Sequence, residues 1–183
     1  QYHCVSIALG GEISRLDTTA LQSGEGTHCA LDGLAHIAAQ QVADTHTCIT
    51  HGQAHGTSRQ LHKCIVADSA HAVFNGRVQV HPGAQKIDSA QSSRTLLLGP
   101  KARVNTLPQL EINADDVRCT HGATVGQLDN DALFYLQSRG LSPEAARRLL
   151  TYAFAAEVIG RIPVASVRQQ LETTVLHHRS TQP

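Results

Sequence analysis

A cysteine and a histidine two residues apart form the pair in this sequence with the clearest chemical potential. Cys119-Thr120-His121 lies in a stretch with the pattern of a β-strand, and residues two apart on a strand point to the same face. A thiolate and an imidazole held together can bind iron or zinc, and histidine replaces cysteine in some iron–sulfur centres. Because the pair supplies only two ligands, a metal bound by Cys119 and His121 needs further ligands from elsewhere in the chain or from a second chain.

Other candidate groups carry less weight. His51 and His55 have the i, i+4 spacing of metal-binding pairs, but they flank Gly52 in a stretch without helical character, so we expect no metal site there. The acidic pairs Asp115-Asp116 and Asp129/Asp131 offer carboxylates. Adjacent acids on a strand point to opposite faces, so solvated turns explain these pairs better than a catalytic dyad does.

Common catalytic motifs are absent from the sequence. The chain has no G-x-x-x-x-G-K-[ST] phosphate-binding loop. It also lacks the G-x-S-x-G and H-E-x-x-H signatures of two classes of hydrolase. We therefore do not expect nucleotide hydrolysis, or either of those two hydrolytic chemistries, from this chain.

Composition narrows the class of protein further. Of the 183 residues, 41% are hydrophobic and the formal net charge is zero, which argues against disorder and against an electrostatic nucleic-acid binder. No apolar run is long enough to span a membrane. The five cysteines form no Cys-x-x-Cys pair, which excludes zinc-ribbon and thioredoxin-type motifs and is typical of a reducing compartment. Aromatic residues are only 3%, a composition that suits thin stacked layers.

Short apolar runs recur through the first two thirds of the chain. Markers in successive runs are separated by 18, 16, 15, 17 and 15 residues: Leu31, Ile49, Ile65, Val80, Leu97 and Ile112. Two runs share a local pattern, His46-Thr47-Cys48-Ile49 and His62-Lys63-Cys64-Ile65. Such self-similarity indicates the coils of a solenoid. We predict a mainly β fold with a right-handed parallel β-helix, and a β-sandwich of short strands is the alternative.

Turn residues and helix signals divide the chain. Corners are expected at Gly52, Gly56, Asn75-Gly76, Pro82-Gly83 and Gly99-Pro100. After Gly126 the periodicity becomes helical, so we predict a β-helix core over residues 1–126 and a small C-terminal α-helical region over residues 127–183. The strand-like alternation that begins at Gln1, without an initiating methionine, leads us to expect that the chain starts inside the β-helix domain.

Three helices are expected in the C-terminal region. The first begins after an Asp129 N-cap, covers 130–138 and stops at Gly140; the second begins at Ser142-Pro143-Glu144 and closes at Gly160; the third opens at Pro163. Four of the six Phe and Tyr residues lie in this short region: Phe134, Tyr135, Tyr152 and Phe154. Such clustering fits either a docking surface or a local core.

Several segments together resemble the SufB/SufD family of iron–sulfur cluster assembly proteins. They lie between His71 and Gly160 and include Val73-Phe74-Asn75-Gly76-Arg77-Val78, Gln91-Ser92-Ser93-Arg94-Thr95-Leu96-Leu97-Leu98, Pro108-Gln109-Leu110-Glu111-Ile112 and Cys119-Thr120-His121-Gly122-Ala123-Thr124-Val125-Gly126. Residues 1–70 fit only in general character. Within the family the chain is similar to the SufD branch, because it reads Lys101-Ala102-Arg103-Val104-Asn105-Thr106 where the SufB branch has a Cys-Gly-Ala-His-Thr type motif.

The resemblance implies a scaffold that is not itself an enzyme. It implies pairing with SufB through the β-helix end and docking of the ATPase SufC on the C-terminal helices, at about residues 129–160. By carry-over it implies that His121 contributes to a nascent iron–sulfur cluster, or iron, shared with a SufB cysteine, with Cys119 as its neighbour in the motif. No tightly bound cofactor is expected in the isolated chain, and the expected compartment is the cytoplasm or a plastid stroma.

Three functions remain open at this stage. The first is the cluster-assembly scaffold. The second is a β-helix carbohydrate-active enzyme, which would need a cleft with paired carboxylates and stacking aromatics, although the solenoid half has only Tyr2 and Phe74. The third is a structural partner that never contacts metal. Because unpaired strand edges seek partners, a second copy of the chain is an alternative to SufB at the solenoid end.

Overall fold

A computed structural model describes residues 1–177 of the chain, so residues 178–183 of the expected helical region lie outside the described residues. The strands are β1 (Tyr2–Ala8), β2 (Ile13–Gln22), β3 (His28–Ile37), β4 (Val42–His51), β5 (Thr57–Val66), β6 (His71–Val80), β7 (Ile87–Leu97), β8 (Arg103–Ile112) and β9 (Val117–Gly126). The helices are α1 (Asn130–Ser138), α2 (Pro143–Ile159) and α3 (Ala165–His177).

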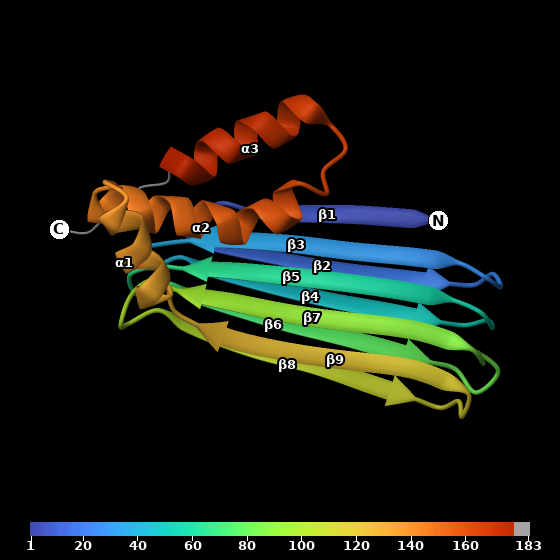
Figure 1. Cartoon of the computed structure of the whole chain (residues 1–183). Coiled ribbons are helices and arrows are strands. Elements are labelled where there is room, and N and C mark those ends of the chain that lie inside the picture. The colour runs from blue at the N-terminus through green and yellow to red at the C-terminus, as the bar shows by residue number, and fades with distance from the viewer. Residues whose placement is uncertain (178–183) are drawn as a thin grey trace.

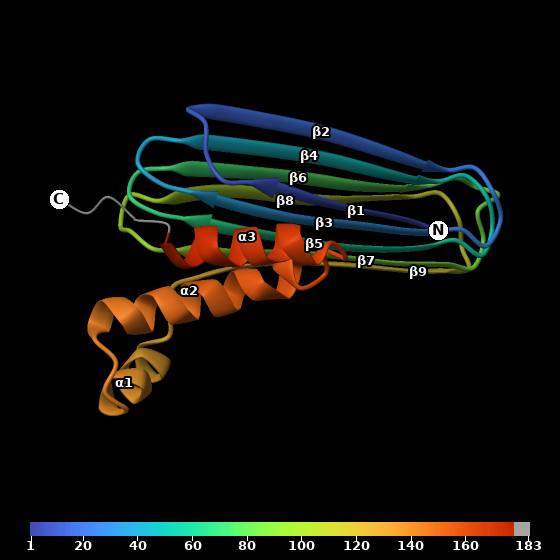
Figure 2. The same ribbon diagram turned by 90° about the horizontal axis from the view of Figure 1, so that it is seen from above.

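The strands form two parallel sheets that face each other. One has the order β1-β3-β5-β7-β9 and the other the order β2-β4-β6-β8. Consecutive strands therefore alternate between the sheets, and two strands with two turns make one coil of a flattened solenoid (Figure 1, Figure 2). The predicted parallel β-helix is confirmed. The β-sandwich alternative is wrong, because sandwich strands pair in antiparallel fashion.

The coil is twice as long as the spacing of the apolar runs. Residues that lie side by side on adjacent coils are 29 positions apart at His28 and Thr57 and 31 apart at Ser58 and Ser89. Each interval of 15 to 18 residues in the sequence therefore carries the chain from one sheet to the other. The two similar segments that contain Cys48 and Cys64 lie in β4 and β5, on opposite sheets.

Most of the expected corners are turns, and one expectation is wrong. Gly52, Gly56, Pro82-Gly83 and Gly99-Pro100 all lie between strands. Asn75-Gly76, in contrast, lies in the middle of β6. A Cβ atom added to Gly76 would lie 2.1 Å from Nε2 of Gln91 and 2.7 Å from Cζ of Phe74. Gly76 therefore leaves room for the neighbouring side chains inside the solenoid. It does not form a turn.

The two sheets differ in what covers their outer faces. Helix α2 lies along the outer face of the sheet that contains β3 and β5, and α3 packs beside α2 (Figure 1, Figure 2). Leu34, Leu61 and Ile65 on that face form a core cluster with Ala155 and Val158 of α2. Strands β3 and β5 are therefore buried on both faces over most of their length, whereas β6 alternates between buried and more exposed residues.

The first two helices begin where the sequence predicts, whereas α3 begins at Ala165, two residues after the predicted start at Pro163. The Asp129 side chain accepts hydrogen bonds from the backbone N–H groups of Asp131 and Ala132, and the Ser142 hydroxyl accepts one from the N–H of Ala145. Gly140 adopts φ +94°, a left-handed conformation that a non-glycine residue rarely adopts, and ends the first helical segment. These caps satisfy backbone groups that a helix terminus leaves unpaired.

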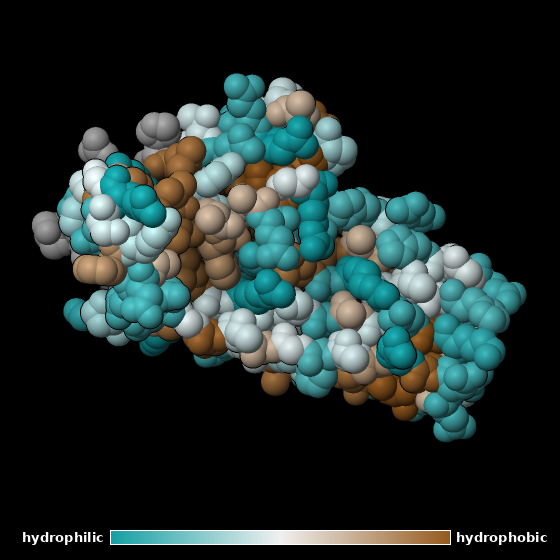
Figure 3. Space-filling model, in the orientation of Figure 1, coloured by the Kyte–Doolittle hydropathy of each residue, from teal (hydrophilic) through white to brown (hydrophobic). Residues whose placement is uncertain are grey.

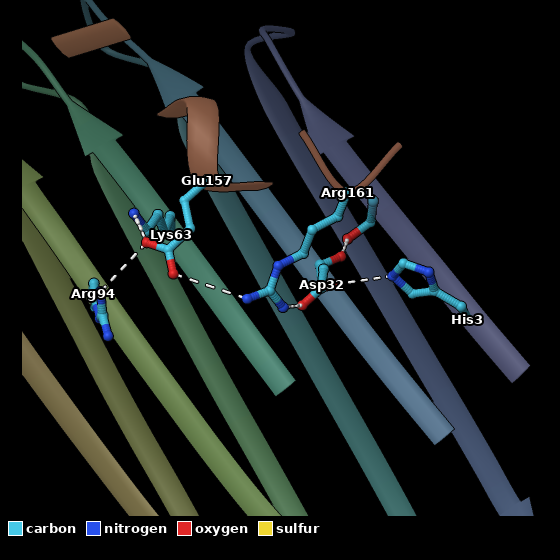
Figure 4. Close-up of polar contacts among 7 residues, drawn as sticks. His3, Asp32, Lys63, Arg94, Glu157 and Arg161 are labelled. Carbon is cyan, nitrogen blue, oxygen red and sulfur yellow. Dashed lines mark hydrogen bonds and ion pairs between the residues drawn. The ribbon is translucent and has the colours of Figure 1, made fainter. Parts of the chain in front are cut away.

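A buried lysine fastens α2 to the solenoid (Figure 4). The Lys63 side chain is only 4% exposed, and its Nζ lies 2.5 Å from Oε2 of Glu157. The same ammonium donates to the carbonyl oxygen of Phe154 at 2.8 Å and lies 4.4 Å from the centre of that ring. Lys63 holds the pKa of Glu157 below its ordinary value by hydrogen bonding.

A second ionic contact lies beside the first (Figure 4). Nη1 of Arg161 donates to Oδ1 of Asp32 at 2.7 Å, and Nε2 of His3 lies 2.9 Å from Oδ2 of the same carboxylate, whose side chain is 1% exposed. Arg161 also lies 3.8 Å from Glu157. The two contacts together join α2, and Arg161 two residues after its end, to strands β1, β3 and β5.

We expect Glu157→Gln to lower the free energy of unfolding by about 2 kcal/mol, because it leaves the buried Lys63 ammonium without its carboxylate. Chemical denaturation followed by circular dichroism measures this change. The matched control is Glu111→Gln, which removes a carboxylate 3.5 Å from the half-exposed Arg77 guanidinium and should cost less than about 1 kcal/mol. Equal losses in the two variants would contradict the role of Lys63.

Candidate functional site

His121 and Cys119 lie on the last strand of the solenoid. In β9, Cys119 is in register with Ser89 and His121 with Gln91, and both of these β7 residues are buried between the sheets. Cys119 and His121 therefore share the inward-facing side of β9, as the sequence predicts. No further coil covers β9 among residues 1–177, so His121 is exposed, while Cys119 is half-buried.

At the end of the solenoid, side chains that point toward the interior are exposed, because no further coil covers them within residues 1–177. We define the solenoid end as the inward-facing residues of the last strand in each sheet. These are Val104, Thr106, Pro108, Leu110 and Ile112 of β8 and Cys119, His121, Ala123 and Val125 of β9. Ile112 is 40% exposed and Val125 50%. Hydrophobic atoms reach the surface where β8 ends and β9 begins (Figure 3).

The backbone of β8 also has an open edge. Arg103 and Asn113 donate their N–H groups to the carbonyls of Ala70 and Val80, at 3.0 Å in each case, on the β6 side. Alternation along a parallel strand turns the intervening N–H groups toward the open side. Pro108 has no N–H and removes one of those outward donors. The solenoid end thus combines apolar side chains with a strand edge that Pro108 partly blocks, and the proline limits indiscriminate strand pairing.

The two candidate ligands differ in their surroundings. Burial raises the pKa of the Cys119 thiol, and the nearby Asp88 carboxylate raises it further. Cys119 also packs against the core cluster that contains Val80 and Ile87. A thiol with a raised pKa is a weaker metal ligand and nucleophile than a thiolate. Of the pair, the exposed His121 is therefore the better placed to meet a ligand or a metal at the solenoid end.

This chain does not bring a complete metal site together within residues 1–177. No group of three or more His, Cys, Asp or Glu side chains in that part of the chain could hold a metal ion. The donor set at the solenoid end, one imidazole and one thiol, suits iron or an iron–sulfur cluster in ligand type but not in number. A metal at His121 would need its remaining ligands from outside residues 1–177.

Two hydrogen-bonded pairs of buried polar side chains lie inside the solenoid, next to Cys119 and His121. Gln60 and Gln91 are 5% and 3% exposed, and Nε2 of Gln91 donates to Oε1 of Gln60 at 2.7 Å. Beside them, the Ser58 hydroxyl donates to that of Ser89 at 2.8 Å. Sequence reasoning missed both pairs. The signal that could have found them is the recurrence of Gln and Ser 31 residues apart, which is informative only when the coil length is known.

The weaker candidates do not come together as sites. His51 is fully buried and its Nε2 lies 3.0 Å from the Ser58 hydroxyl, whereas His55 lies in a turn with an exposed side chain. Asp116 forms an exposed ion pair with Lys86 at 3.1 Å. Asp129 is the N-cap of α1. The predicted turn is confirmed for Asp115 and Asp116, whereas Asp131 lies in the first turn of α1. The buried position of His51 removes it from any surface metal site.

The aromatic residues of the helical region divide into two groups. Tyr152 and Phe154 are half-buried against the core cluster between α2 and the sheet. Phe134 and Tyr135 on α1 are 74% and 56% exposed. Leu149 of α2 is 42% exposed, and hydrophobic atoms form a band on the surface where α1 and α2 meet (Figure 3). The region therefore contains both a local core and an uncovered apolar surface.

Comparison with known proteins gives a family match that includes all nine strands. The family described as "SUF system FeS cluster assembly, SufBD core domain" matches residues 1–154, and these include residues 1–70, where the sequence resemblance is only general. Within residues 1–177, no helix is long and apolar enough to cross a membrane.

Relatives from three lineages cover nearly the whole chain. An iron-sulfur cluster assembly SufBD family protein of Synechocystis is 45% identical over 96% of this chain and 39% of its own length. The iron-sulfur cluster assembly protein SufD of Escherichia coli is 43% identical over 91% of this chain and 39% of its own. Protein ABCI7, chloroplastic, of Arabidopsis thaliana is 42% identical over 96% and 37%. The chain thus spans less than two fifths of these relatives' length.

Proposed function

Since this chain belongs to the SufBD family of iron–sulfur cluster assembly proteins, we propose that it acts as a non-catalytic scaffold on which a nascent cluster is built. The observation that carries this proposal is the exposed imidazole of His121 on an uncapped solenoid end. The cluster, or its iron, is cargo shared between this chain and a partner. The cytoplasm or a plastid stroma is the proposed compartment, since its relatives include bacterial proteins and a chloroplastic one.

The proposed partner at the solenoid end is SufB. The apolar inward-facing residues of β8 and β9 favour a partner that continues the core, and the incomplete ligand set at His121 requires donors from a second chain. A soft thiolate from the partner would complement the imidazole. A site divided between two chains can also release its cargo when the chains move apart. A second copy of this chain in place of SufB is an outcome that the experiment below distinguishes.

The proposed docking surface for the ATPase SufC is the helical region, at about residues 129–160. Phe134 and Tyr135 project from α1, which points away from the solenoid (Figure 2). Large aromatic side chains that remain exposed on a helix are typical of interface anchors. Because α2 is fastened to the sheet through Lys63 and Glu157, a movement of the docked ATPase would be transmitted to the solenoid.

A carbohydrate-active enzyme is not favoured by the position of the aromatic residues. Phe74 is fully buried and stacks on His62 with ring centres 4.3 Å apart, so it is not available to a sugar. Tyr2 is 54% exposed but lies at the opposite end of the solenoid from His121. The solenoid within residues 1–177 therefore offers no row of exposed aromatic rings on which sugar units stack.

His121→Ala is expected to reduce the iron and acid-labile sulfide held by the reconstituted complex with SufB and SufC by about tenfold or more, because a ligand is lost. Metal and sulfide analysis of the purified complex measures this loss. His81→Ala, at an exposed turn histidine, is the matched control and should retain the wild-type content. Cys119→Ser in the same assay separates the contribution of the thiol.

Co-purification of all three chains is measured in parallel. Wild-type iron content with His121→Ala would reject the ligand role and favour the purely structural partner. Loss of iron together with loss of SufB binding would make His121 an interface residue only. If the chain self-associates and excludes SufB, its partner at the solenoid end is a second copy of this chain and not SufB.

A further inference from the structure

A row of four side chains runs through the solenoid interior and ends at His121. Leu31, Gln60, Gln91 and His121 are successive register partners on β3, β5, β7 and β9. The Gln60 amide donates to the Thr47 hydroxyl at 2.7 Å, and the Gln91 amide donates to Oε1 of Gln60 at 2.7 Å. The Gln91 amide N–H thus points back along the row, away from the solenoid end, whereas the Gln60 amide N–H points to β4 of the opposite sheet.

The last amide of this row has an unused acceptor. Oε1 of Gln91 is inaccessible to solvent and has no hydrogen-bond partner within residues 1–177. A buried carbonyl oxygen without a hydrogen-bond partner destabilises the folded state. In a planar amide the oxygen and nitrogen diverge from the same carbon, so an Nε2 directed at Gln60 leaves Oε1 directed the other way. The next residue in that direction, one strand spacing of about 4.8 Å away, is His121.

The orientation of the Gln91 amide is held by the opposite sheet. A Cβ atom on Gly76 would lie 2.1 Å from Nε2 and 2.9 Å from Cδ of Gln91, so the amide lies directly against the backbone of β6. While the Gln60 amide donates to the Thr47 hydroxyl, its carbonyl oxygen faces Gln91, and a reversed Gln91 amide would place one carbonyl oxygen against another. The position of Oε1 is therefore set before any cargo arrives.

We propose that Gln91 is a positioning residue for His121: its Oε1 accepts the ring N–H of His121 and turns the other ring nitrogen, with its lone pair, out of the solenoid end. The proposal rests on the proposed function of His121 as a ligand of the nascent cluster. A metal-ligating histidine commonly donates its second ring N–H to a protein acceptor, which fixes the tautomer and the ring orientation. Here a neutral amide inside the solenoid fills that role.

The tautomer of His121 tests this proposal without any metal. Long-range ¹H–¹⁵N NMR on the full chain at pH 8 reports which ring nitrogen carries the proton. The wild type should show one tautomer, with a slowly exchanging ring N–H. Gln91→Met, which keeps the side-chain length and removes the acceptor, should show a mixture of both tautomers. The control Gln109→Met makes the same change on the outer face of β8 and should match the wild type.

The outcomes separate this inference from the proposed function. Identical tautomer populations in the wild type and Gln91→Met overturn the inference. So does a wild-type spectrum with mixed tautomers, a measurement that requires no variant to fold. In the complex with SufB and SufC, Gln91→Met should retain about tenfold less iron than Gln109→Met. Full iron retention in His121→Ala together with a tautomer that depends on Gln91 would reject the proposed function and leave the hydrogen bond supported.

Discussion

Gly33→Ala is expected to lower the free energy of unfolding by about 3 kcal/mol, because the solenoid interior has no room for the added methyl group. Its Cβ would lie 2.2 Å from Nδ1 and 2.7 Å from Cε1 of His62. The His62 ring cannot move aside, since it is 3% exposed and stacks on Phe74. Chemical denaturation followed by circular dichroism measures the change.

The matched control for this substitution is Gly122→Ala on β9, where an added Cβ meets no atom within 4 Å and the change should stay within about 0.5 kcal/mol. A further variant tests the cause. In the Gly33→Ala background, His62→Ala removes the obstructing ring and should recover part of the loss, a coupling that a double-mutant cycle measures. Equal stability of Gly33→Ala and Gly122→Ala would show that the interior is less tightly packed than the structure indicates.

The folded chain is expected to lose stability between pH 6.5 and about 4 through two buried histidines. Burial lowers the pKa of His51 and of His62 from 6.5 to about 4 in each case. In this range the unfolded chain binds protons at these rings and the folded chain does not, so the free energy of unfolding falls as the pH falls. The difference corresponds to about 3 kcal/mol for each ring when the pH reaches 4.

Denaturation midpoints at pH 7, 6 and 5 measure this dependence above the range in which carboxylates such as Glu157, whose pKa is lowered, lose their charge. His62→Gln should remove about half of the pH dependence, because one of the two rings is lost. His81→Gln, at an exposed turn, should leave the dependence unchanged. A midpoint that stays constant from pH 7 to pH 5 would mean that water or a conformational change admits the proton to both rings.

Local signals predicted the helical region well. The side chains of Asp129 and Ser142 accept backbone N–H groups at the starts of α1 and α2, and Gly140 has the left-handed φ expected of a helix stop. A helix cap involves residues only two or three positions apart, so its chemistry can be read directly from the chain. The surface against which α2 packs could not be predicted in this way, because Lys63 and Glu157 are far apart in the sequence.

The interior of the solenoid is where sequence reasoning was least informative. Asn75-Gly76 has the composition of a turn, yet Gly76 lies within β6 because the Gln91 amide occupies the space next to it. Several turns, in contrast, contain non-glycine residues with a positive φ, including Ala39, His55 and Lys86. The type of a residue indicates which backbone conformations it can adopt. The neighbour on the next coil, about 30 residues away, determines how large a side chain fits at that position.

The candidate site was predicted only in part. The i, i+2 spacing of Cys119 and His121 places both on one face of a strand in any β-structure, so their juxtaposition follows from the chain itself. Their different exposures, and the register of Gln91 with His121, depend on how the coils stack.

By itself the amino-acid sequence determined the recurrence of strands, the change to helices after Gly126, the helix caps and the pairing of Cys119 with His121, because each depends on residues close together in the chain. Long-range strand pairing establishes that two runs make one coil, that β9 is the last strand of its sheet within residues 1–177, and that Gln91 is in register with His121. These depend on register between coils, which is set by the summed packing of whole strands rather than by any local pattern.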